Sequence, residues 1–486
     1  MTTNDPANLV VIMSDEHDPR YMGCSGHSLV KTPNLDKLAA RGLRFANAYT
    51  PCPICVPARA AFATGAYVHQ TGYWDNAIAY DGRIPSWGHA LQKAGVPVES
   101  IGKLHYKDNE LPTGFDRQHQ PMHIYKGRGM VWGSIRDPLP EVPFDHRMIG
   151  DAVGPGESSY NRYDRATAEM AVDWFKQHAN ESPWVLFVGF VAPHFPFVAP
   201  QQFFDLYPIE SLPERKLDPR NGYKHHPWIA AQDRMWPHDK MFKNEDERKL
   251  AVAAYYALCS YVDANIGLVL DGLEQAGLTS TTRVIYTSDH GDNVGARGLW
   301  GKSNLYQESV TVPMIAAGPG IECRVVNTPV NLTDLYPTIL EVVGVTDIDA
   351  SIARPGRSLF SIAQETAQPN RAVFSEYHAF GAESGAFMLR KGRWKYHYYV
   401  GFAPELFDLE HDPEELVDLA ADPSSRPVLE ELHCELLAIC DPVAVDREAK
   451  VDQARLIESH GGREAARKVG APGATPAPSK TGEATR

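Results

Sequence analysis

Several features that would narrow the function of this 486-residue chain are missing from its sequence. It contains no run of about 18 apolar residues, so we expect no transmembrane helix and no membrane partner. Residues 1–6 lack a basic stretch followed by an apolar core, so we expect no signal peptide. Basic residues are not in excess, and the formal net charge of −14 argues against nucleic acid as a partner, because phosphate binding requires a positive face.

Cysteine is scattered without the paired spacing that is typical of zinc sites. The seven cysteines are Cys24, Cys52, Cys55, Cys259, Cys323, Cys434 and Cys440. Cys52 and Cys55 form one C-x-x-C pair, but no thioredoxin-like strand–helix–strand pattern surrounds it, which disfavours a redox motif. Reduced thiols fit this odd, dispersed set best, and we therefore expect a cytoplasmic protein.

Short apolar runs, each followed by polar residues, indicate a buried sheet. The runs lie at 8–13, 184–190, 283–287 and 313–317, and a long amphipathic helix is expected at about 245–275. Alternating strands and helices predict an α/β protein with a large, mostly parallel central sheet flanked by helices. Three of the runs end at Asp15, at His194 and at Asp289-His290, so we expect one shared site along one edge of the sheet.

The pattern changes after about residue 365. Short runs at 372–375, 386–390 and 394–399 are joined by glycine-containing turns, and a leucine-rich helix is expected from about Pro427. These segments predict a small antiparallel sheet with one helix. We therefore divide the chain into a large α/β domain (1–365), which is the expected catalytic domain if the chain is an enzyme, a C-terminal subdomain (366–445) and a C-terminal helix with a flexible tail (446–486). The end of that tail, from about 470, is rich in Ala, Pro, Gly and Thr and is expected to be disordered.

The most informative stretch is Cys55-Val56-Pro57-Ala58-Arg59, followed by small residues as far as Thr64-Gly65. It resembles the sulfatase signature C-x-P-x-R. In that family a formylglycine-generating enzyme oxidises the cysteine to formylglycine (3-oxoalanine), and the hydrate of this aldehyde attacks the sulfur of a sulfate ester. The resemblance implies an alkaline-phosphatase-like fold, a modified Cys55 as nucleophile and the maturation enzyme as a partner. Taken alone, the five residues also fit a proline-containing turn with a buried cysteine.

The order of further motifs extends the resemblance to most of the chain. Asp15 precedes the signature and Asp289-His290 follows it, as in the sulfatase branch of the alkaline phosphatase superfamily. A late Asp-His pair, where arylsulfatases usually have Asp-Asn, is similar to the choline sulfatase and phosphonate monoester hydrolase subgroup. The resemblance implies one divalent metal ion ligated by Asp15, the modified Cys55, Asp289 and His290. An imidazole among oxygens favours Mn²⁺, and Ca²⁺ stays open; Glu16 is doubtful as a direct ligand.

Cationic and imidazole side chains complete the implied site. Gly102-Lys103-Leu104-His105 resembles the family motif G-K-x-H, and alternation along an extended segment predicts that Lys103 and His105 point the same way. The resemblance implies that Lys103 neutralises sulfate oxygens and that His105 hydrogen-bonds the nucleophile or accepts its proton. It further implies that His194 donates to the leaving-group oxygen, that Lys302 pairs with sulfate and that Arg59 orients the nucleophile. Considered one at a time, the lysines and the arginine also fit ordinary surface residues, and the histidines also fit core residues.

Together these residues imply hydrolysis of small anionic sulfate monoesters, alkyl or aryl, to an alcohol and sulfate. Asn76 lies in a segment similar to one in choline sulfatases, so we expect it near the bound ester. Aromatic and acidic side chains could bind a quaternary ammonium, as in choline sulfate; the candidates are Trp74, Trp132, Glu376 and Tyr377, and a core role fits each of the aromatic residues at least as well. The tail lacks the aromatic-rich extension of choline sulfatases, and the leaving group therefore stays open.

Two other functions remain open on the sequence. The same site could hydrolyse phosphonate monoesters or phosphodiesters, because it accepts tetrahedral anions of similar size. With an unmodified Cys55 the chain would instead be an inactive anion-binding protein. The resemblance also implies a homo-oligomer, and the Trp- and Tyr-bearing insertions at 127–143 and 212–242 are candidates for interfaces or active-site lids.

Overall fold

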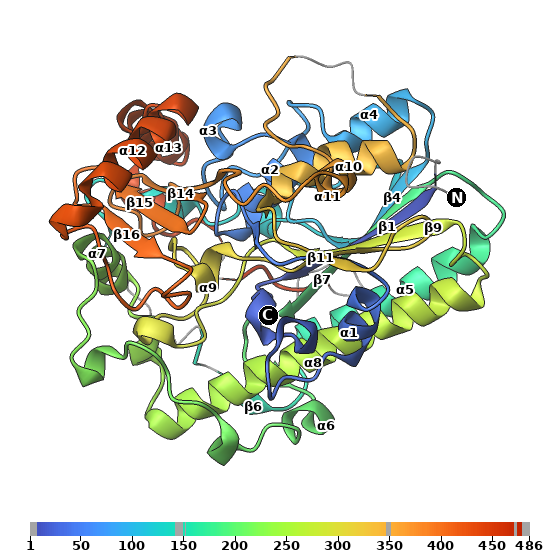
Figure 1. The fold of residues 1–486 in the computed structure, drawn as a ribbon, viewed down its shortest axis with the longest axis horizontal. Coiled ribbons are helices and arrows are strands. Elements are labelled where there is room, and N and C mark those ends of the chain that lie inside the picture. Colours follow the sequence, from blue (N-terminus) through green and yellow to red (C-terminus); the bar gives the residue numbers. More distant parts are fainter. Residues whose placement is uncertain (1–6, 141–148, 151, 347–350, 471–473, 479–486) are drawn as a thin grey trace.

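The computed structural model describes residues 7–140, 149–150, 152–346, 351–470 and 474–478. In these residues the central element is an eight-stranded sheet with the strand order β11-β2-β10-β9-β1-β7-β4-β5 (Figure 1). Its strands are β1 (Asn8–Asp15), β2 (Gly42–Phe45), β4 (Val98–Lys103), β5 (Arg117–Met122), β7 (Val185–Pro193), β9 (Thr282–Ser288), β10 (Met314–Ala317) and β11 (Arg324–Val326). All neighbouring strands are parallel except β10, which is antiparallel to both β9 and β2. The mostly parallel sheet is confirmed, with the run at 313–317 as its reversed strand.

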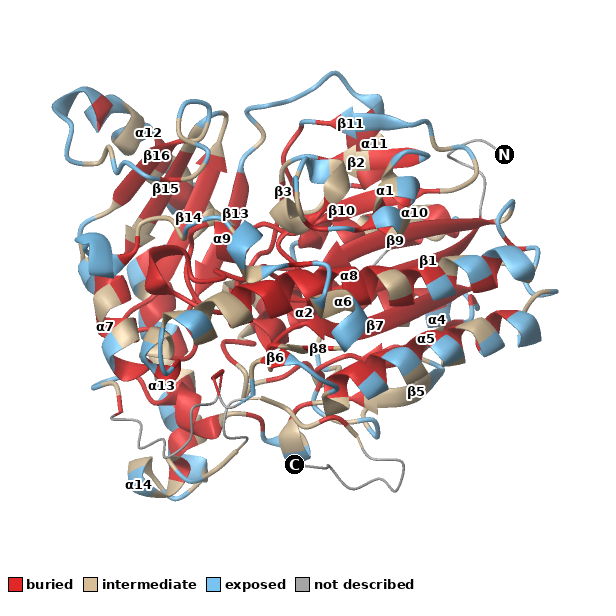
Figure 2. Ribbon diagram, turned by 90° about the horizontal axis from the view of Figure 1, so that it is seen from below, coloured by how far each residue is buried: buried red, intermediate tan, exposed pale blue. Residues whose placement is uncertain are grey.

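Helices cover both faces of the sheet because its strands are apolar on both sides. In β1, Val10 and Ile12 pack into one core, whereas Leu9, Val11 and Met13 pack into a second core on the opposite face. The helices of the first face are α1 (Pro33–Ala39), α5 (Ser159–Gln177) and α8 (Glu245–Gln275). Those of the second face are α2 (Cys55–Thr64), α4 (Trp87–Lys93), α10 (Leu335–Val342) and α11 (Leu359–Gln364). The central strands such as β1 and β7 are buried, the edge strands β5 and β11 are partly exposed, and α5 has one exposed side (Figure 2).

Among the described helices, α8 alone is long and apolar enough to cross a membrane, and 89% of its most apolar window is buried inside the protein. This burial is that of a core helix. It packs mainly on α5 and β7.

The predicted C-terminal antiparallel sheet is also confirmed. Its strands are β13 (Val373–Tyr377), β14 (Ala386–Lys391), β15 (Trp394–Tyr399) and β16 (Glu405–Asp408), followed by α12 (Arg426–Ile439) and α13 (Pro442–Ser459). Helix α13 crosses the domain boundary drawn at residue 445. The remaining short elements are β3 (Ala48–Tyr49), β6 (Gly154–Pro155), β8 (Val198–Ala199), β12 (Val330–Asn331), α3 (Val68–Thr71), α6 (Gln201–Phe204), α7 (Pro227–Met235), α9 (Gln307–Val310) and α14 (Arg463–Ala466).

Part of the tail that was expected to be disordered is packed against the catalytic domain. Tyr160 donates its hydroxyl to the carbonyl of Thr475, and Ala477 is buried beside Met122 and Tyr163. The expectation of disorder is therefore wrong for residues 474–478, while 471–473 and 479–486 lie outside the described residues. Composition predicts that such a segment has no core of its own, but small side chains can fill a groove of another surface.

The strand order brings distant residues to one edge of the sheet. β9, β1, β7 and β4 are consecutive and parallel, so their carboxyl ends lie side by side. β1 ends at Asp15, β4 ends at Lys103, and Asp289 and His194 directly follow β9 and β7. Ligand sites of α/β proteins lie at this end of the strands.

Candidate active site

Cys55 begins α2 at the centre of this edge. Its Sγ lies 3.6 Å from Asp15 Oδ1 and 3.2 Å from His290 Nε2. Burial and the charge of Asp15 raise the pKa of the Cys55 thiol well above its ordinary value. Helix α2 ends at Thr64 and is capped by Gly65, whose φ of +70° is readily adopted by glycine and where a Cβ would lie 2.7 Å from Tyr336 Cβ.

Four buried residues are arranged as a metal site. Asp15, Cys55, Asp289 and His290 each offer one ligand atom, and these atoms all lie within 4.8 Å of one another. His290 Nδ1 donates to the carbonyl of Gly291 at 3.0 Å, which leaves the lone pair of Nε2 free on the side of Cys55. Two carboxylates and an imidazole around residue 55 fit one divalent cation of the Ca²⁺ or Mn²⁺ type.

Arg59 and Lys103 hold the two carboxylates of this group. Arg59 Nε lies 2.7 Å from Asp289 Oδ2, its Nη2 lies 3.3 Å from Asp15 Oδ2, and its Nη1 donates to the carbonyl of Lys103. Lys103 Nζ lies 2.5 Å from Asp15 Oδ2. Burial opposes ionisation of Asp15, but the cationic groups around it outweigh burial and keep its pKa well below the ordinary value. The guanidinium of Arg59 thus contacts two of the candidate metal ligands, Asp15 and Asp289.

Glu16, Lys302 and His194 form a second group beside the first. Lys302 Nζ lies 2.8 Å from Glu16 Oε1, and His194 Nδ1 lies 3.6 Å from Glu16 Oε2. Burial raises the pKa of Glu16 to about 8, although Lys302 opposes this shift. Burial, reinforced by Lys302, lowers the pKa of His194 well below its ordinary value. Glu16 is therefore the partner of Lys302, and it stands outside the four-residue metal group.

The expected extended geometry of the G-K-x-H motif is wrong. β4 ends at Lys103, and His105 has a φ of +58°, so the chain turns between the two residues. Both side chains still line the same cavity. His105 Nε2 lies 2.8 Å from Thr475 Oγ1, a contact with the tail for which the sequence holds no signal. Burial and then Lys103 lower the pKa of His105 well below its ordinary value.

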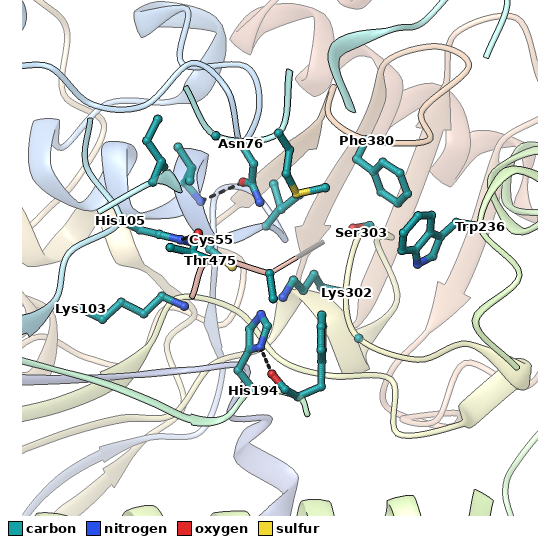
Figure 3. A pocket seen from close by; sticks show the side chains of 18 of the residues that line it. Cys55, Asn76, Lys103, His105, His194, Trp236, Lys302, Ser303, Phe380 and Thr475 are labelled. Atoms are coloured by element: carbon teal, nitrogen blue, oxygen red, sulfur yellow. Dashed lines mark hydrogen bonds between the residues drawn. The ribbon is translucent and has the colours of Figure 1, made fainter. Parts of the chain in front are cut away.

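A cavity with about 60 Å³ of space for water-sized molecules lies over this group and opens to solvent, although Cys55, Lys103 and His105 are themselves buried. In Figure 3, Lys103 and His105 lie on one side of Cys55, and the ammonium of Lys302 points toward the centre of the cavity. Asn76 also lines the cavity, and its Oδ1 accepts a hydrogen bond from the backbone N–H of Val56 at 3.2 Å. Six of the predicted site residues therefore meet in one cavity, with the two aspartates, Arg59 and His290 outside its lining.

The side chains suggested for a quaternary ammonium do not line this cavity. The four are Trp74, Trp132, Glu376 and Tyr377. Trp74 donates to Asp452, and Glu376 is enclosed between His69 and His378. Each is buried in packing or in a local ion pair, so none of the four is an ammonium ligand in this cavity and the alternative of a core role holds for the aromatic residues.

Comparison with known protein families shows to which family the chain belongs. The family model described as Sulfatase matches residues 7–345. The chain belongs to the sulfatase family. It is a sulfuric ester hydrolase. A second family model, whose description is "N-sulphoglucosamine sulphohydrolase, C-terminal", matches residues 295–441 of this sulfatase.

Two curated relatives cover most of the sulfatase. A choline-sulfatase of Rhizobium meliloti is 31% identical over 442 residues, which are 87% of this chain and 84% of the relative. Arylsulfatase K of Rattus norvegicus is 31% identical over 447 residues, 85% of this chain and 75% of the relative. The fold is similar to that of the phosphonate monoester hydrolase of Agrobacterium radiobacter, with a TM-score of 0.72, 22% identity, and coverage of 89% of this chain and 95% of that one.

Sequence reasoning did not single out every residue of the cavity. Thr475, Trp236 and Phe380 line it, and so does Met130. Trp236 and Met130 belong to the two insertions predicted as lids or interfaces, so the sequence indicated these two segments but not the individual residues. Nothing in the sequence distinguishes Phe380 from a core aromatic residue.

Proposed function

We propose that this sulfatase hydrolyses sulfate monoesters with a formylglycine made from Cys55 and one divalent cation, Ca²⁺ or Mn²⁺. Asp15, residue 55, Asp289 and His290 would hold the cation. The observation that carries the proposal is the convergence of these four ligand atoms within 4.8 Å at the start of α2, directly below a cavity lined by cations. The net reaction takes a sulfate ester and water to an alcohol and sulfate.

The formylglycine would supply an oxygen nucleophile in hydrated form, and the cation would lower the pKa of that hydroxyl and polarise a sulfate oxygen. Lys103 and Lys302 reach the cavity and can stabilise negative charge on the sulfate oxygens. His194 Nδ1 donates to the carbonyl of Phe195 at 2.5 Å, so its Nε2 is the atom that can hold a proton for the leaving oxygen. A bound anion favours that protonated form.

The second candidate is hydrolysis of phosphonate monoesters or phosphodiesters. It is supported by the likeness of the fold to the phosphonate monoester hydrolase and by the cavity's cations, which suit any tetrahedral anion. Purified protein should therefore be assayed with a matched aryl sulfate and aryl phosphonate monoester. We expect kcat/KM to be higher for the sulfate, and a reversed preference would favour the second candidate.

The nucleophile is tested by mass spectrometry of the tryptic peptide that contains residue 55. Protein produced with a formylglycine-generating enzyme should show a loss of roughly 18 Da relative to the thiol form. Cys55→Ala, which cannot be converted, is the control and should lack turnover while keeping the melting temperature. An unmodified thiol in protein that still hydrolyses sulfate esters would contradict the proposal. A thiol in protein that binds sulfate without turnover would favour the inactive anion-binding protein.

A further inference from the structure

The cavity has a second end, opposite Lys103 and His105, whose lining is apolar and aromatic. Figure 3 shows Trp236 and Phe380 beyond Ser303 and Lys302, on the side away from Lys103. We propose that this end selects an uncharged, apolar leaving group and that Trp236 and Phe380 determine this specificity. The inference rests on the proposed sulfate ester hydrolysis, because it concerns the part of the ester that leaves as the alcohol.

The aromatic wall is fixed in place by packing. The indole of Trp236 stacks on Trp132, with ring centroids 5.5 Å apart and an interplanar angle of 23°. Phe380 meets Trp236 nearly perpendicularly at 4.9 Å and Trp132 at 5.1 Å. One face of the Trp236 indole is thus covered by protein, which reduces the π surface available to a cation. A rigid wall of this kind favours burial of apolar surface.

The charge of the lining argues against a cationic leaving group. Among the described residues that line the cavity there is no Asp or Glu, whereas Lys103 and Lys302 both line it. Glu16 lies behind the cavity wall and is paired with Lys302. His238 Nδ1 donates to the carbonyl of Trp300 at 2.9 Å, and burial lowers the pKa of this histidine to about 3, so it adds no charge. A quaternary ammonium would therefore lie near the Lys302 ammonium without a carboxylate of its own.

Few polar groups are available for a leaving group with many hydroxyls. Beside Trp236 and Phe380 the cavity is lined by Ser303 and His238, while Asn76 lies nearer to Cys55 and its side-chain carbonyl already accepts from Val56. Ile54, Ile124 and Met130 also line the cavity with apolar side chains. Sugar hydroxyls buried here would lack partners, which is unfavourable, whereas an apolar or aromatic alcohol needs none.

Choline O-sulfate and 3,3-dimethylbutyl sulfate provide a matched test, because they differ only in a charged nitrogen or a neutral carbon at the same position. We expect kcat/KM to be at least about tenfold higher for the neutral ester. The dissociation constants of both esters are measured by calorimetry on Cys55→Ala, which cannot turn them over, and should show the same order. Equal values or a preference for choline O-sulfate would overturn the inference.

The wall itself is tested by a pair of variants at one position. Phe380→Glu adds a carboxylate, and Phe380→Gln is its control of the same shape without charge. For each variant we take the association constant and the kcat/KM of choline O-sulfate, each divided by the value for 3,3-dimethylbutyl sulfate. We expect both ratios to be at least about tenfold higher in Phe380→Glu than in Phe380→Gln. An unchanged ratio would show that Phe380 does not face the leaving group.

Turnover of 4-nitrophenyl sulfate separates this inference from the proposed function. If that ester is hydrolysed but choline O-sulfate is preferred over its neutral analogue, the inference fails and the function stands. If no sulfate ester is hydrolysed by protein with formylglycine at position 55, the proposed function fails. The binding ratio measured on Cys55→Ala still decides the selectivity of the cavity in that case.

Discussion

Replacing Arg59 by methionine tests how the two aspartates of the metal group coexist. Arg59 lies 2.7 Å from a carboxylate oxygen of Asp289 and 3.3 Å from one of Asp15, and it is 1% exposed. Arg59→Met leaves Asp289 without this partner, while Asp15 keeps Lys103. Removal of one member of a buried ion pair costs about 3–5 kcal/mol, because the remaining charge stays buried. We expect the metal-free variant to lose stability by this amount.

The assay is thermal unfolding of the metal-free protein, monitored by calorimetry. For a chain of 486 residues the unfolding entropy is about 1 kcal/mol per kelvin, so the expected loss lowers Tm by roughly 3–5 °C. Arg426→Met is the matched control, because Arg426 is 81% exposed in its ion pair with Glu430 and its replacement should cost less than about 1 kcal/mol. If the two variants melt within about 1 °C of each other, the aspartates do not depend on Arg59 and the reasoning is refuted.

Three further predictions concern single side chains. Burial lowers the pKa of His17 from 6.5 to about 4, and its Nδ1 accepts from the Tyr286 hydroxyl at 2.5 Å. Since the unfolded chain binds a proton more readily, stability should be lost as pH falls from about 6.5 to 4, by about 3 kcal/mol, and His17→Gln should flatten this slope in melts recorded against pH. His194→Ala should reduce kcat/KM more for alkyl sulfates than for 4-nitrophenyl sulfate, and equal losses would argue against proton donation. Thr475→Val removes the hydrogen bond to His105 and should lower kcat/KM about fivefold with a changed pH profile; unchanged kinetics would show that this tail contact is dispensable.

Four strands of the large sheet, β1, β7, β9 and β10, could be predicted because their signal is local, whereas the short edge strands β5 and β11 carry no long apolar run. The run at 8–13 is buried along its whole length in β1, as expected for a strand covered on both faces. The reversed direction of β10 could not be predicted, because an apolar run has the same pattern whichever way the chain passes through the sheet. Its direction is set by the connection from β9, which returns the chain alongside that strand.

The candidate site could be predicted where a motif coincides with the end of an element. Asp15 and Lys103 are the last residues of their strands, and Cys55 is the first residue of α2. The contact between His105 and Thr475 joins residues 370 positions apart, one of them in a segment of low complexity. Such contacts depend on how the surfaces of folded segments pack against each other, and no periodicity or motif in the sequence indicates them.

The charges of the site explain how a chain with a net charge of −14 can offer a cavity to an anion. Lys103 and Lys302 are only 2% and 10% exposed, and an unpaired ammonium at that depth would be costly. Each ammonium lies within ion-pair distance of a buried carboxyl group, Asp15 for Lys103 and Glu16 for Lys302. In the proposed reaction a sulfate ester would share or replace the carboxyl partner of each lysine, so that neither lysine would be left unpaired. The pKa of Glu16, raised to about 8 by burial, favours this exchange, because the carboxylate that gives up Lys302 can take a proton instead.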